Sequence, residues 1–261
     1  MSDKIDVIVQ KAAEKAVEII ISKAYQDVAH PGLSSFGQIL SYLPRTVQAW
    51  LAPWEKYILI QESNMAQFKK TLQDKINKIP ENKFTEPEPY VAIPALQQLC
   101  YCLDSEALRD MYGQLIASSM DRDKKEYVHP AFVDIIKQLN PDEAKLIKSF
   151  KIGRNYPLVD IIKQVTDVTD SYTIEKNNYS NIAYGICEYP QNIAAYLENL
   201  DRLGIISIGS DAHSLHNTTL YDGILSMPDI QLLLQKGCID TKKFFSITEF
   251  GNSFIRCVCE A

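Results

Sequence analysis

Apolar residues recur at three- and four-residue spacing along most of this chain, which is the period of an amphipathic helix. The pattern is clearest near the N-terminus, where residues 3–27 carry an apolar stripe and place most of their charges on the other face. It returns over residues 53–79, 93–103 and 105–120. The spacing therefore predicts an N-terminal part, residues 1–139, that is built from packed helices.

The segment Pro80–Tyr90, with the sequence PENKFTEPEPY, interrupts this helical pattern. It contains three prolines and three glutamates and has no aliphatic residue. A segment of this composition has no apolar face to bury, and each proline removes a backbone hydrogen-bond donor. We therefore expect a linker near residues 80–90 inside the helical N-terminal domain.

A histidine followed by a proline, His129-Pro130, stands just before the apolar run FVDIIKQL. Proline suits the first turn of a helix, because the N–H group that it lacks has no partner within the helix there. No nearby Ser, Cys or Asp is spaced to act with His129 as a nucleophile. We predict that His129 has a structural role at a helix start and that it is not catalytic.

Asn140 and Pro141 mark the start of the next helix in the same way. Asn140 is a favoured N-cap, and Asp142 and Glu143 suit the positive end of the helix dipole. This helix is the first element of a second predicted domain, residues 140–261.

The order of elements expected after Asn140 is that of a winged helix. The chain as a whole is then predicted to be mainly α, with a helical N-terminal portion followed by a winged-helix-like α+β C-terminal domain. The expected elements are a short strand at 156–162, a polar loop at 167–181, a helix at 190–203 closed by Gly204, strands at 205–208 and 242–248, and helices at 227–237 and 249–259.

Several polar residues of this domain form a candidate binding surface for DNA or for a protein. Asn and Gln side chains can read adenine edges, but Glu198 and Asp201 on the same helix would repel phosphates. The net charge of −6 also argues against a nucleic-acid ligand. The candidate residues are Gln191, Asn192, Tyr196, Asn199, Arg202, Lys242 and Lys243.

The cysteines and the N-terminus point to a reducing compartment. The cysteine pairs Cys100/Cys102 and Cys257/Cys259 lie in apolar runs without a histidine at metal-ligand spacing, so we expect buried thiols, no metal and no obligatory disulfide. The first residues carry charges throughout and contain no signal-peptide core. A cytoplasmic location and no cofactor are the expectations.

Three segments together resemble the abortive infection alpha family of bacterial proteins. They are PEPYVAIPALQQLCYCLDSEALRDMYGQLIASSMD, the following VHPAFVDIIKQLNPDEAKLIKSF, and the upstream LPRTVQAWLAPWEKYIL. The resemblance covers roughly residues 25–150. It implies a role in bacterial defence against phage and brings no catalytic residues with it.

Three functional hypotheses follow. The first is a non-enzymatic phage-defence protein that binds a phage or host component, which is supported by the lack of nucleotide-binding, hydrolase and metal-protease motifs. The second is a winged-helix DNA-binding regulator. The third is a membrane-active effector, in which Trp50, Trp54 and Tyr57 lie at helical spacing and suit a membrane interface or a partner surface.

Overall fold

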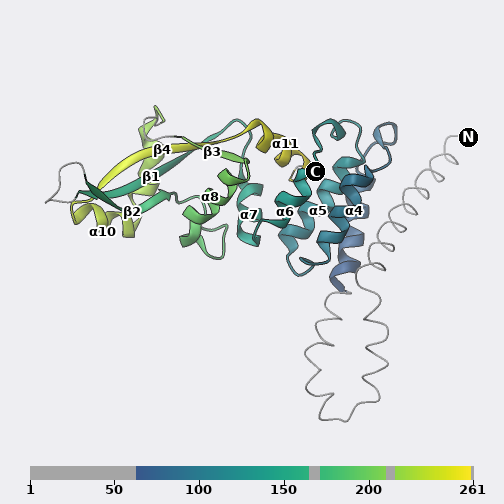
Figure 1. Cartoon of the computed structure of the whole chain (residues 1–261), viewed down its shortest axis with the longest axis horizontal. Helices are drawn as coiled ribbons and strands as arrows, with labels where there is room; N and C mark the ends of the chain where they lie inside the picture. The colour runs from purple at the N-terminus through teal and green to yellow at the C-terminus, as the bar shows by residue number, and fades with distance from the viewer. Residues whose placement is uncertain (1–62, 165–170, 210–214, 260–261) are drawn as a thin grey trace, which may run out of the picture. The chain divides into compact units, whose positions relative to one another are not determined.

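The structure is a computed structural model that describes residues 63–164, 171–209 and 215–259 (Figure 1). The chain divides into two compact units. The first unit comprises Met1–Pro141 and Arg256–Ala261, and the second comprises Asp142–Ile255. The predicted helix at residues 3–27 and the residues Trp50, Trp54 and Tyr57 lie outside the described residues.

The first unit is helical. A helix over residues 63–77 is followed by the 3-10 turn η1 (Glu81–Lys83), α4 (Pro89–Leu99), α5 (Glu106–Ser119), the 3-10 turn η2 (Lys125–Tyr127) and α6 (Ala131–Lys137). Helices α4, α5 and α6 pack against one another in pairs. Their contact surfaces are apolar, and the fully buried side chains include Leu72, Leu99, Met111, Leu115 and Ile136.

Helices α5 and α6 begin where the sequence predicts them, and the linker is shorter than expected. The Ser105 hydroxyl accepts the Leu108 N–H bond at 3.4 Å and so caps α5. The ring nitrogen of His129 accepts the Ala131 N–H bond at 3.1 Å at the start of α6. Helix α4 begins at Pro89, inside the predicted linker. Proline is tolerated in this first turn, because the N–H group that it lacks has no partner within the helix there.

The second unit contains a four-stranded antiparallel sheet that curls into a half-barrel. The strand order is β2-β1-β4-β3, so β1 and β4 are central and lie side by side in Figure 1. The strands are β1 (Asn155–Gln164), β2 (Tyr172–Tyr179), β3 (Ile206–Ile208) and β4 (Ile239–Ile247). The helical elements are α7 (Pro141–Ser149), η3 (Pro190–Asn192), α8 (Ile193–Arg202), η4 (Thr218–Tyr221), α9 (Asp222–Leu225), α10 (Pro228–Gln235) and most of α11 (Glu249–Val258), whose last three residues are assigned to the first unit.

The centre of this sheet is held by aromatic packing across the β1–β4 pair. Tyr156 lies opposite Phe245, and their rings stack with centroids 4.9 Å apart. Phe150, which follows α7, places its ring 5.2 Å from Tyr156 and 5.5 Å from Phe245. The three rings form one aromatic cluster in the core of the second unit.

The pairing between β1 and the edge strand β2 contains a bulge. The register changes between Val159 and Ile161, and Asn178 adopts a positive φ of 47° at this point. The Asn178 N–H group donates to the carboxylate of Asp160 at 2.8 Å. A side chain of β1 therefore replaces a backbone partner where the ladder is irregular.

The predicted fold class is wrong: the protein is mixed α/β, and the second unit is not a winged helix. A winged helix needs a further helix between its first strand and the helix at 190–203. Here residues 172–179 form β2, a strand of eight residues that pairs with β1. This segment resembled a loop because it is polar. Most residues of β2 are exposed, so the strand lacks the alternation of apolar and polar residues that marks a half-buried strand.

Most other elements of the second unit lie where the sequence indicated. Gly204 ends α8 with a φ of 73°, and the Ile205 N–H group returns to the Leu200 carbonyl at 3.0 Å. The Thr248 hydroxyl accepts the Gly251 N–H bond at 2.8 Å and caps α11. These ends are encoded locally, which explains why the sequence alone predicts them.

Candidate functional site

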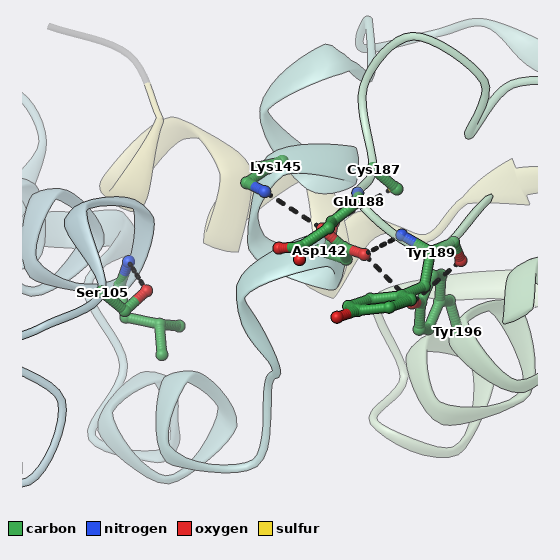
Figure 2. Close-up of polar contacts among 8 residues, drawn as sticks. Ser105, Asp142, Lys145, Cys187, Glu188, Tyr189 and Tyr196 are labelled. Carbon is green, nitrogen blue, oxygen red and sulfur yellow. Dashed lines mark hydrogen bonds and ion pairs between the residues drawn. The ribbon is translucent and has the colours of Figure 1, made fainter.

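A buried carboxylate, Asp142 in the first turn of α7, organises the polar centre of the second unit. It accepts the backbone N–H bonds of Glu188 at 2.9 Å and Tyr189 at 2.8 Å. It also accepts the Tyr196 hydroxyl at 3.1 Å and pairs with the Lys145 ammonium at 3.1 Å. Figure 2 shows these bonds converging on one carboxylate from α7, from α8 and from the segment before α8.

The electrostatics of Asp142 follow from these contacts. Burial by itself raises the pKa of this carboxyl, but the two backbone N–H groups, Lys145 and Tyr196 outweigh burial and hold the pKa below its usual value. Asp142 therefore stays ionised, with its oxygens already occupied by donors. The sequence suggested a contribution to the helix dipole, and the structure shows a hydrogen-bonded anchor in addition.

A second contact from α7 fixes α8. The Asn199 amide donates to the Glu143 carboxylate at 2.9 Å, and Glu143 is buried. The Tyr196 hydroxyl also lies 3.1 Å from the Tyr189 carbonyl. Two neighbouring acidic residues of α7 thus hold both α8 and the segment that precedes it.

That segment, residues 180–190, is called the anchored loop below. Ala183 is fully buried, and Gly185 turns the chain with a φ of 79°. Three apolar side chains of the loop nevertheless face solvent: Tyr184 is 41% exposed, Ile186 36% and Tyr189 51%. The backbone of this loop is bonded to a buried residue, Asp142, while its aromatic and aliphatic side chains face solvent. This combination is typical of a protein-binding surface.

A polar network fixes the ring of Tyr184 from the opposite end of the loop. Its hydroxyl lies 3.2 Å from the Tyr179 hydroxyl, which in turn donates to the Asp229 carboxylate at 3.3 Å. Burial, the hydrogen bond to Tyr184 and the negative charge of Asp229 raise the pKa of Tyr179, so its hydroxyl keeps its proton. Lys176 pairs with the same Asp229 at 3.3 Å.

Two residues of the predicted surface, Tyr196 and Lys243, have buried side chains. Tyr196 bonds to Asp142, and Lys243 pairs with Asp160 at 2.6 Å. Both are therefore parts of the interior of the second unit and do not present their side chains to a ligand.

The remaining predicted surface residues are spread over several elements. Gln191 and Asn192 are exposed in η3, directly after the anchored loop. Arg202 is exposed on α8, and its Nη2 donates to the Asn199 amide oxygen at 2.7 Å. Lys242 is half-buried and lies 5.7 Å from the centroid of the Tyr221 ring. The first two extend the exposed face of the anchored loop.

The described residues contain no group of three or more His, Cys, Asp or Glu side chains placed to hold a metal ion. All six cysteines lie in the described part of the chain and are free thiols. Within the described residues, none of the helices combines the length and the apolar character needed to cross a membrane.

The anchored loop was missed by reasoning from the sequence. Its signal was the cluster YGICEY, residues 184–189, in which two tyrosines and an isoleucine surround a glycine between polar segments. The apolar spacing of the sequence points to the helix that follows, because such spacing marks helices and does not mark loops. The anchoring role of Asp142 had no sequence signal, since three of its four donors, Glu188, Tyr189 and Tyr196, lie more than forty positions along the chain.

The comparisons with known proteins give one match. The family model described as "Abortive infection alpha" matches residues 60–258. No match was found among curated proteins, and none was found among solved structures. The matched region spans both units, and so extends the resemblance seen in the sequence to nearly the whole described chain. The chain belongs to the abortive infection alpha family, which places it in bacterial defence against phage.

Proposed function

We propose that this protein is a non-enzymatic phage-defence protein of the cytoplasm that acts by binding a phage or host protein through the anchored loop. The observation that carries the proposal is the exposure of Tyr184, Ile186 and Tyr189 on a loop whose backbone is bonded to the buried Asp142. The six free thiols suit the reducing cytoplasm.

The physical argument for binding is pre-organisation. Tyrosine supplies a large contact area with few rotatable bonds, and it is enriched among the residues that dominate protein interfaces. A loop already fixed by Asp142 and by the Tyr184–Tyr179 contact loses little conformational freedom when a partner binds. The exposed amides of Gln191 and Asn192 extend this surface with hydrogen-bonding groups.

Two observations support the non-enzymatic half of the proposal. The carboxylate of Asp142 is occupied by four donors, so it is not poised to take a proton from a substrate. Cys187 beside it donates its thiol to the Asp142 carbonyl at 3.6 Å, and burial raises the pKa of this thiol. A thiol with a raised pKa is a weak nucleophile at neutral pH.

The proposal is tested by phage plating with two matched double variants. Ile186→Thr with Tyr189→Thr changes the anchored loop, and Tyr172→Thr with Ile174→Thr removes the same two residue types from β2, where both are 56% exposed. With a phage that the wild type restricts, the loop pair should raise plating by at least about tenfold, because the exposed tyrosine and isoleucine would carry much of the binding energy. The β2 pair should restrict like the wild type.

A photo-crosslinking amino acid at position 189 identifies the partner directly. A discrete protein adduct is expected from this position in infected or uninfected cells, and no equivalent adduct is expected from position 172. Restriction that survives in both double variants, with no adduct at position 189, would contradict the proposal. Circular dichroism melts show whether each variant is folded before plating is interpreted.

A further inference from the structure

We propose that a pocket in the first unit binds the phosphate group of a small phosphomonoester such as a nucleoside monophosphate. The pocket has a volume of about 210 Å³ and lies between the end of the helix at residues 63–77, helix α5 and the loop after α5. It belongs to one unit and is separate from the anchored loop, so it does not depend on the function proposed above.

The charges that line this pocket favour an anion. Lys75, Lys78 and Lys124 contribute ammonium groups, and Asp121 contributes the opposing carboxylate. Part of the Asp121 carboxylate is occupied, since its Oδ1 accepts the Asp123 N–H bond at 3.0 Å. Because Lys75 is paired with Asp110, the excess is that of Lys78 and Lys124 over Asp121. In a chain of net charge −6 this local positive charge favours a ligand with more than one negative charge, as a phosphomonoester has near neutral pH.

Lys75 is held in place before any ligand arrives. Its ammonium lies 2.8 Å from the Asp110 carboxylate and 3.1 Å from the Gln114 amide oxygen, and its side chain is 13% exposed. An ammonium has three hydrogens, so these two contacts leave one for a ligand. A fixed, partly desolvated lysine binds an oxyanion more strongly than a mobile surface lysine does.

The buried wall of the pocket also presents one donor, the second amide hydrogen of Gln114. The bond from Lys75 to the amide oxygen fixes the orientation of the Gln114 amide. The amide nitrogen then donates one of its two hydrogens to the Ser118 hydroxyl at 3.5 Å. The Ser118 hydroxyl uses its own hydrogen to donate to the Cys257 carbonyl at 2.9 Å. Gln114 and Ser118 are both buried. This orientation suits a ligand whose oxygens only accept hydrogen bonds.

The pocket also has an apolar side, to which Ile79 and Ala117 contribute. An inorganic phosphate ion would gain nothing from these side chains, whereas the sugar or base of a nucleotide buries apolar surface against them. The combination of a basic end and an apolar wall therefore fits an organic phosphate better than a free ion.

The test is a calorimetric titration of the full chain at constant ionic strength. Inorganic phosphate, adenosine monophosphate and uridine monophosphate are titrated separately, and a saturable dissociation constant of about 1 mM or lower is expected for at least one. The pocket pair Lys78→Ala with Lys124→Ala is compared with Lys69→Ala with Lys70→Ala, which removes the same charge from exposed positions on the helix at 63–77. Binding should weaken at least tenfold in the pocket pair and less than twofold in the other pair.

The relative affinities of the three probes and of the two lysine pairs support or overturn the proposal. Tighter binding of either nucleotide than of phosphate supports an organic phosphate, and equal binding supports the phosphate site with the free ion as its ligand. The absence of saturable binding for all three probes overturns the proposal. Equal weakening by the two lysine pairs also overturns it, because general charge attraction would then explain the binding. Circular dichroism melts of both pairs establish that they remain folded.

Discussion

Lys243 of β4 forms a 2.6 Å ion pair with Asp160 of β1, and the two side chains are only 7% and 11% exposed. The neighbouring strands place them diagonally on the same face, since Lys243 lies opposite Leu158. The second carboxylate oxygen of Asp160 holds the Asn178 N–H group of the β2 bulge. One buried pair thus connects three strands of the sheet.

Replacing one member of this pair should strongly destabilise the protein. Lys243→Met leaves the Asp160 charge buried without its partner, and we expect a loss of about 3–5 kcal/mol in the free energy of unfolding. Urea unfolding followed by circular dichroism measures it. The control is Lys242→Met at the adjacent, half-buried position, for which a loss below about 1 kcal/mol is expected. Equal losses at the two positions would contradict the structural role of Lys243.

Asp142 should make part of the stability depend on pH. Its pKa is lower in the folded state than in the unfolded chain, so its contribution is complete above the unfolded value of about 4 and is lost as pH falls through the lower folded value. Asp142→Asn should lower the free energy of unfolding by about 2–3 kcal/mol at pH 7. The NH2 group of the new amide would face N–H groups that also donate and would leave them without an acceptor. Urea titrations at several pH values should show the gap between wild type and variant closing below about pH 4. A gap that widens toward acid pH would reverse the assigned sign.

The anchored loop should loosen when Asp142 changes, without any change in its own sequence. The amide hydrogens of Glu188 and Tyr189 are bonded to the Asp142 carboxylate and should exchange slowly in the wild type. In Asp142→Asn their exchange should accelerate by at least about tenfold, measured by NMR. The amide of Leu203, which is bonded to Asn199 at 2.9 Å, serves as the internal control and should change little. Uniform acceleration of all three amides would indicate global destabilisation instead.

Gly251→Ala should destabilise α11 although alanine is the better helix former. On helix propensity alone the change would stabilise the helix by about 1 kcal/mol. A Cβ atom at Gly251 would lie 1.9 Å from the Ile205 carbonyl oxygen, which is backbone and has little room to move. We expect a net loss of about 3 kcal/mol or failure to fold, measured by thermal melting. Ser253→Ala on the same helix adds no atom and removes only an exposed hydrogen bond to the Glu249 carbonyl, so it should change stability by less than about 1 kcal/mol.

The cysteines should contribute neither a disulfide nor a reactive thiolate. Burial, helped by the negative charges of Asp104 and Cys100 and opposed by Arg109, raises the pKa of Cys102 to about 12. Cys102 should therefore react with a thiol reagent at pH 8 far more slowly than the same cysteine in urea, as measured by mass spectrometry. The melting temperature should be the same with and without reductant. A fall of several degrees on adding reductant would reveal a disulfide that the structure lacks.

Several helix ends were determined by the sequence alone, because they depend on neighbouring residues, whereas α4 begins and ends four residues before its predicted range of 93–103. Ser105 accepts an N–H bond three residues ahead, and Gly204 provides the positive φ that ends α8. The sequence also identified the family, since segments spread along residues 25–150 resemble it and the family model matches residues 60–258.

The fold class and the site were decided by tertiary structure. The polar segment at 172–179 is a strand because β1 supplies its hydrogen-bond partners, and no property of the segment itself requires pairing. The sequence alone suggests that Lys243 is a surface cation, and only the fold places it in a buried ion pair with Asp160. Asp142 reads as a helix-dipole residue until Glu188 and Tyr189, more than forty positions along the chain, donate to it. Local patterns report the interactions of near neighbours, whereas burial and pairing depend on chain segments that only folding brings together.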